Sequence, residues 1–113
     1  MSIIATIGKR NESIKVISVE GHSNAIDKKS DYKLVCAGVS SVMVGLLNAI
    51  DELEKDSCEI TLNESENPDT NHITIVVTND SKDLQLILKV GEIQLKTIEL
   101  NYNKYLDLKI TEV

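Results

Sequence analysis

Hydrophobic and polar residues alternate along the first part of the chain. The run from Ile3 to Arg10 and the run from Ile14 to Glu20 are rich in β-branched residues and predict two strands. The segment Asn11-Glu12-Ser13 between them is typical of a turn. We therefore expect a hairpin that ends at Gly21 and His22.

The hydrophobic period becomes helical in the middle of the chain. From about Val35 to Lys55, apolar residues recur at steps of three and four, which predicts an amphipathic helix with one buried stripe. A second such pattern follows the N-cap candidates Asn79-Asp80-Ser81 and runs to about Asn101. Gly91 lies inside this second pattern and weakens a helix by about 1 kcal/mol relative to alanine, so a break is expected near it.

Three further strands complete the pattern. Cys58–Leu62 is a short alternating run, and Tyr105–Val113 is a longer one at the end of the chain. His72–Thr78 is almost continuously apolar, which favours a central position in a sheet. The polar segments Ser23–Lys33 and Asn63–Asn71 predict loops, and a loop as long as the first is more often functional than not.

These elements follow one another in the order ββαββαβ. Each helix has a single apolar stripe to bury, so the expected fold class is α/β, in the form of an α+β sandwich. We expect a mixed sheet of about five strands with both helices on one face. The 113 residues suit a single domain, 1–113.

Composition restricts the function. Apolar residues make up 42% of the chain, with no Phe or Trp, so the core must be aliphatic. The net charge is −6 and no basic patch is present, which argues against direct nucleic-acid binding. An acidic surface suits a basic protein or peptide partner, although acidity also keeps proteins soluble.

Ligating residues are scarce as well. Two cysteines and two histidines make neither a disulfide framework nor a metal site, and no cofactor is expected. No charged leader opens the chain, and no apolar run approaches the roughly 20 residues of a membrane span. We therefore expect a cytoplasmic protein with reduced thiols and no membrane attachment.

One pair of residues carries candidate chemistry. Cys36 is expected in the first turn of the first helix, within reach of solvent, and His22 at the end of a strand. The partial positive charge at a helix N-terminus favours a thiolate, and a nearby histidine can take the thiol proton. In that arrangement the amide of Cys36 would help to hold an oxyanion.

Each of these residues also has a simpler interpretation. Most unpaired cysteines are small buried hydrophobes, and a lone histidine at a strand end is often a surface residue. Cys58 is expected to be structural. His72 is expected to be inert and to lie away from the predicted site.

The two motifs resemble those of the ribosomal-processing cysteine protease family (Prp). Gly21-His22-Ser23 corresponds to the family's Gly-His-Ala, and Leu34-Val35-Cys36-Ala37-Gly38-Val39-Ser40 to its Asp-Ile-Val-Cys-Ala-Ala-Val-Ser. The resemblance implies a small α/β fold, usually dimeric, with Cys36 as nucleophile and His22 as general base. It also implies the substrate, a basic precursor whose N-terminal extension is removed to give large-subunit ribosomal protein twenty-seven.

The chain departs from the family pattern before the cysteine. The family has an aspartate three residues before it, where this chain has Lys33, and the nearest acid is Asp31. The segment between His22 and Cys36 is also about two residues longer. Asp31 is therefore a candidate replacement for the acid, and Gly21 and Ser40 are candidate substrate-binding or supporting residues.

Two other functions fit the same residues. A non-catalytic assembly factor that binds a basic ribosomal protein would tolerate the changed acid position and the longer loop. A thiol redox or acyl-transfer module would use the same cysteine, but the chain has no neighbouring resolving cysteine.

Overall fold

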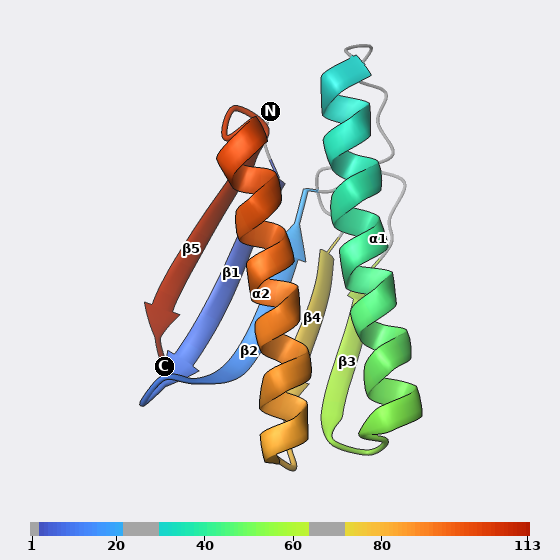
Figure 1. The fold of residues 1–113 in the computed structure, drawn as a ribbon, viewed down its shortest axis with the longest axis vertical. Helices are drawn as coiled ribbons and strands as arrows, with labels where there is room; N and C mark the ends of the chain where they lie inside the picture. Colours follow the sequence, from blue (N-terminus) through green and yellow to red (C-terminus); the bar gives the residue numbers. More distant parts are fainter. Residues whose placement is uncertain (1–2, 22–29, 64–71) are drawn as a thin grey trace.

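Seven elements follow the predicted order ββαββαβ in the computed structural model, which describes residues 3–21, 30–63 and 72–113 (Figure 1). They are β1 (Ile3–Arg10), β2 (Ser13–Glu20), α1 (Ser30–Leu53), β3 (Cys58–Asn63), β4 (His72–Val77), α2 (Lys82–Tyr102) and β5 (Leu106–Glu112).

The five strands form one mixed sheet in the order β3-β4-β2-β1-β5. Strand β1 is antiparallel to β2 and parallel to β5, and β4 is antiparallel to both β2 and β3. Both helices cover the same face of this sheet and run antiparallel to each other (Figure 1). The predicted sandwich is confirmed. Strand β4 has a neighbour on each side, but the middle strand of the sheet is β2.

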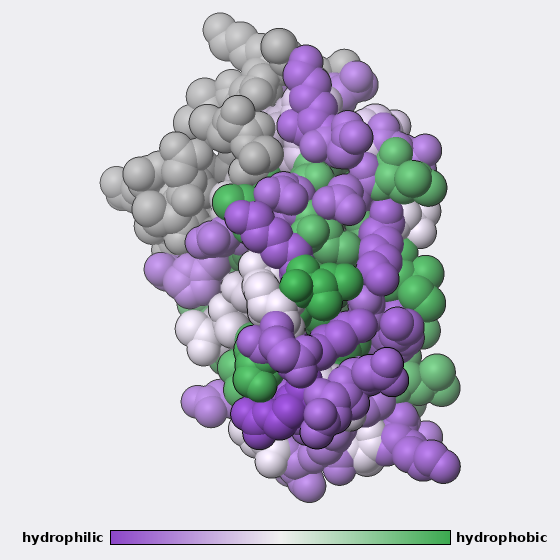
Figure 2. Space-filling model, turned by 90° about the vertical axis from the view of Figure 1, so that its left-hand side faces the viewer, coloured by the Kyte–Doolittle hydropathy of each residue, from purple (hydrophilic) through white to green (hydrophobic). Residues whose placement is uncertain are grey.

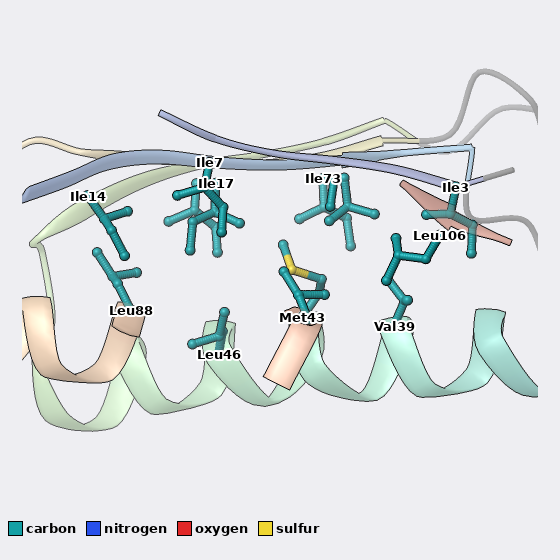
Figure 3. Packing of buried hydrophobic residues seen from close by; sticks show 14 of the residues in the cluster. Ile3, Ile7, Ile14, Ile17, Val39, Met43, Leu46, Ile73, Leu88 and Leu106 are labelled. Atoms are coloured by element: carbon teal, nitrogen blue, oxygen red, sulfur yellow. The ribbon is translucent and has the colours of Figure 1, made fainter. Parts of the chain in front are cut away.

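The core lies between the sheet and the two helices and is aliphatic, as expected. Figure 3 shows Val39, Met43 and Leu46 of α1 pointing toward the isoleucines of the sheet. Ile7 and Ile17 are paired across β1 and β2 and are fully buried. The helices therefore have a fixed position on the sheet, set by interdigitating branched side chains.

Helix α2 begins at the predicted cap. The Ser81 hydroxyl accepts a hydrogen bond from the Leu84 amide and also contacts the carboxylate of Glu54, near the end of α1. The break expected near Gly91 is absent, and α2 is continuous. Gly91 is buried where α2 packs on α1, and an added Cβ there would lie 2.5 Å from Leu46 Cδ1, so close helix packing explains this glycine.

Helix α1 begins at Ser30, about five residues before the predicted start. The segment Ser23–Lys33 was expected to be a loop, and its last four residues are helical instead. Tyr32 explains the difference, because it lies one turn before Cys36 and is completely buried. Its side chain therefore extends the buried stripe of α1 toward the N-terminus.

The same helix corrects the expectation that no apolar segment approaches the length of a membrane span. Asp31–Leu53 is long and apolar enough to cross a membrane by length and composition, with a mean hydropathy of 1.7. From Leu34 to Ile50 it carries no charged residue, which raises the hydropathy. In the structure its buried stripe packs on the sheet, and core helices of this kind meet the same criterion (Figure 3).

Candidate active site

Cys36 lies in the second turn of α1, as the seventh residue of that helix. It was expected in the first turn and within reach of solvent. Instead the residue is only 4% exposed and belongs to the buried cluster beneath the sheet. The difference follows from the earlier helix start at Ser30, which places one additional turn before the cysteine.

This position changes the electrostatic argument for the thiol. Only the first four amides of a helix lack partners within the helix, and the favourable effect of the dipole decreases within the first turn. The amide of Cys36 is beyond that turn and takes part in the helix's own hydrogen bonding. The expectation that it holds an oxyanion is therefore wrong for this conformation.

Gly21 directly follows β2, in a conformation that requires glycine. Its φ is +79°, in the left-handed region that side chains disfavour. Its carbonyl oxygen accepts a hydrogen bond of 3.3 Å from the hydroxyl of Tyr32. The residue that precedes His22 is therefore attached directly to α1, one turn before Cys36.

Tyr32 is itself held firmly. Its ring meets the ring of Tyr105 edge-on, with centroids 5.8 Å apart and planes at 61°. The carbonyl oxygen of Tyr105 accepts a hydrogen bond from the amide of Ile3, at the start of β1. The end of β2, the start of α1 and the β5 side of the sheet thus meet at Tyr32.

The sequence motifs did not single out Tyr32, although the sequence does carry a signal for it. Tyr32 precedes Cys36 by four residues and Val39 by seven, which continues the period of the buried stripe toward the N-terminus. An aromatic residue in a polar segment, in phase with the following helix, indicates that the helix begins earlier.

The other predicted site residues differ in their position relative to Cys36. His22 lies outside the described residues, so its relation to Cys36 stays a prediction. Ser40 is half-buried, one turn after Cys36 on the same side of α1. Asp31 is exposed in the first turn. Five residues of helix correspond to a rotation of about 500°, so Asp31 and Cys36 point in directions about 140° apart.

Cys58 has the environment of a structural thiol. Burial raises its pKa, a hydrogen bond from the Ser57 hydroxyl to its sulfur lowers it in part, and the nearby Asp80 charge raises it again. The net pKa lies above the ordinary value, so less thiolate is present at neutral pH. The environment gives no activation of this sulfur.

His72 was expected to lie away from the predicted site, and the sheet separates it from Cys36. It pairs with Glu20, so it lies at the same end of the sheet as Gly21. The alternation along β4 buries Ile73 and Ile75 toward the helices and directs His72 to the opposite face. Cys36 and His72 therefore share an end of the sheet but lie on different sides of it. Within the described ranges, no three His, Cys, Asp or Glu side chains are grouped so as to hold a metal ion.

Comparison with known proteins identifies the family of this chain. Residues 2–107 match the family described as cysteine protease Prp. A relative in Staphylococcus aureus, named ribosomal processing cysteine protease Prp, is 36% identical over 98 residues, covering 87% of this chain and 90% of the relative.

Solved structures give the same result. A crystal structure of the S. aureus Prp with a substrate peptide superposes with a TM-score of 0.77 at 28% identity, covering 96% of this chain and 99% of that one. A Streptococcus mutans protein shares the fold, with a TM-score of 0.84 at 23% identity and complete coverage of both chains.

The fold and the family match define a cysteine protease. The chain belongs to the cysteine protease Prp family. Membership favours the protease over the non-catalytic assembly factor and over thiol redox or acyl-transfer chemistry.

Proposed function

We propose that this protease removes the N-terminal extension from the precursor of large-subunit ribosomal protein twenty-seven during ribosome maturation. The relatives named ribosomal processing protease support this substrate class, as does a relative solved with a substrate peptide. The observation that carries the proposal is the junction of β2 and α1, where Tyr32 attaches Gly21 to the helix that bears Cys36. Gly21, the first residue of one family motif, therefore lies against the helix that carries the other motif.

In the proposed reaction, His22 takes the proton of the Cys36 thiol, and the sulfur attacks the scissile carbonyl carbon. The tetrahedral intermediate collapses as His22 returns the proton to the leaving amine, which leaves an acyl group on the sulfur. Water, deprotonated by His22, then releases the new carboxyl terminus and restores the thiol. Because Cys36 lies beyond the first turn of α1, the dipole gives limited help, and His22 supplies most of the activation.

The burial of Cys36 adds a requirement. Cys36 is only 4% exposed, so its thiol cannot reach a peptide bond until the atoms that cover it move. We propose that binding of the extension opens this access, so that the thiol reacts when substrate is present. The net charge of −6 favours association with a basic ribosomal precursor. We also propose that the enzyme acts in the cytoplasm and that it forms the homodimer that the family resemblance implies.

The test is cleavage of the intact precursor and of a peptide that spans the extension junction, followed by mass spectrometry. Cys36→Ala and His22→Ala should each abolish cleavage, whereas Cys58→Ala should retain it. Persistent cleavage in Cys36→Ala would exclude this nucleophile. Binding of the precursor without cleavage by the wild-type enzyme would contradict the proposed substrate.

A further inference from the structure

Helix α2 has a second apolar stripe on the side away from the core. Leu86, Val90, Ile93 and Leu100 follow one another at steps of four, three and seven residues, and they are 67%, 47%, 52% and 83% exposed. This spacing places them along one line of the helix, about 21 Å long. Figure 2 shows hydrophobic residues recurring along the right-hand edge of the molecule, which is the outer side of the helical layer.

Thr97 occupies the position in this stripe between Ile93 and Leu100. Its hydroxyl donates a hydrogen bond of 2.8 Å to the carbonyl oxygen of Ile93. The helix therefore satisfies this polar group itself, and an apolar partner need not supply a bond to it. The stripe behaves as one continuous apolar line rather than as scattered exposed residues, which would need no explanation.

A groove runs beside the stripe, between α1 and α2. Its volume is about 430 Å³. On the α1 side its rim carries Ser41, Gly45 and Ala49, four residues apart, and no atom lies within 4 Å of a Cβ built on Gly45. Small side chains on one rim and Val90 on the other leave room for the backbone of a third helix to approach closely.

The flank of the stripe opposite the groove is positively charged. Lys82, Lys89 and Lys96 are spaced by seven residues and so form a row along α2. The side chains of Lys89 and Lys96 both reach Glu92 yet stay about half exposed. The only carboxylate that this row contacts, among the described residues, is completely buried, so a net positive charge faces outward on an acidic protein.

We propose that this surface, formed by the outer stripe of α2, the groove and the lysine row, binds an amphipathic helix of another protein whose apolar face is flanked by carboxylates. Charge complementarity selects this occupant. A second copy of the chain would offer either the small residues of α1 or the lysines of α2, and the exposed carboxylates of the helices lie only near the helix ends, at Asp31, Asp51, Glu52 and Asp83. The surface therefore serves a partner distinct from the basic substrate.

The test uses two fluorescent peptides of about 20 residues, long enough to be helical. Both carry leucines at alternating steps of four and three; one has glutamates and the other lysines on the flanking positions. The glutamate peptide should bind the full-length protein at least tenfold more tightly than the lysine peptide, a difference of about 1.4 kcal/mol. Its binding should weaken as the salt concentration rises. Equal binding of the two peptides, or no binding of either, would overturn the proposal.

Protein variants locate the site. Val90→Asp and Ile93→Asp change exposed positions and should each weaken the glutamate peptide about tenfold, and Lys82→Glu about threefold. Val76→Asp changes an exposed valine on the opposite face of the sheet and should bind as wild type does. Sedimentation of the same variants decides the occupant, because a dimer that Val90→Asp converts to monomer would show that a second copy covers this surface and would contradict the proposal.

Discussion

The Tyr32 hydroxyl donates a hydrogen bond to the Gly21 carbonyl oxygen, which connects the end of β2 to the second residue after the start of α1. The tyrosine is completely buried and the glycine has a positive φ, so neither end of this bond adjusts easily. His22 follows Gly21 directly in the chain. The bond therefore determines where the chain leaves the sheet, immediately before the proposed general base.

Replacing Tyr32 with Phe should slow cleavage while leaving the fold intact. The ring keeps its contact with Tyr105 and only the hydroxyl is lost, so the free energy of unfolding should fall by about 1 kcal/mol. Misplacement of the neighbouring catalytic group should affect activity more than the lost hydrogen bond affects stability. We therefore expect kcat to fall about tenfold with a small change in KM. Steady-state kinetics with the extension peptide measure both. Tyr105→Phe preserves the ring pair and the Gly21 bond, and it should retain wild-type kcat; equal losses in the two variants would assign Tyr32 a purely structural role.

The two cysteines should differ in alkylation. In Cys36→Ala, iodoacetamide reports Cys58 alone, and the raised pKa of that thiol should make the reaction slower at neutral pH than for a cysteine in a model peptide. In Cys58→Ser, alkylation reports Cys36 alone. We expect binding of the extension peptide to raise the alkylation rate of Cys36, because the thiol is buried without substrate. Mass spectrometry after timed quenching gives each rate. Fast alkylation of Cys58 at neutral pH would contradict the effect of burial on its pKa.

Asp31→Asn should leave cleavage within about threefold of wild type. The carboxylate is exposed and points about 140° away from Cys36 around α1, so it does not face the thiol in this conformation. Its position in the first turn favours the helix dipole by a few tenths of a kcal/mol, which predicts a small loss of stability instead. Precursor cleavage and thermal unfolding measure the two effects. A loss of more than about a hundredfold in kcat would mean that Asp31 acts on His22 as the family's acid does.

The order of elements could be predicted from the sequence because each amphipathic period was long enough to identify. The start of α1 could not, because Ser30–Lys33 is polar apart from Tyr32, and one aromatic residue does not establish a helical period. That error also produced the incorrect exposure of Cys36. Gly91 misled for a different reason: local propensity disfavours glycine in a helix, whereas the distance between α2 and Leu46 requires it. Motifs located the candidate nucleophile, but only packing shows that it is covered.

Two glycine-to-alanine changes should have opposite effects on stability. Alanine at Gly91 would place its Cβ 2.5 Å from Leu46 Cδ1 and 3.1 Å from Leu46 Cγ, so the helices must separate or Leu46 must move. We expect a loss of about 1–3 kcal/mol despite the better helix propensity. Gly45→Ala meets no atom within 4 Å and should gain up to about 1 kcal/mol. Urea unfolding of both variants measures the difference, and a stabilised Gly91→Ala would show that the helices tolerate greater separation.

Glu92 forms the most extensive ion cluster among the residues that the structure describes. Its carboxylate is completely buried and contacts Lys9 of β1 at 3.0 Å, Lys96 at 3.0 Å and Lys89 at 3.3 Å. Burial alone would raise the pKa of Glu92, but hydrogen bonds from the three lysines and the charge of Lys9 outweigh it and lower the pKa from 4.5 to about 2. The cluster therefore attaches α2 to β1 only while the carboxylate is ionised.

This depressed pKa predicts a specific dependence of stability on pH. The folded protein holds the proton on Glu92 less tightly than the unfolded chain does, so the stabilisation is complete above the unfolded pKa and is lost as pH falls from about 5 toward about 2. Glu92→Gln should lower the free energy of unfolding at neutral pH by about 2 kcal/mol, because three lysines lose their counter-charge. The variant should also lose less stability than wild type across that acidic range. Urea unfolding at a series of pH values tests this, with Glu52→Gln on the exposed side of α1 as the control. Parallel acid profiles for wild type and Glu92→Gln would mean that other carboxylates account for the acid sensitivity.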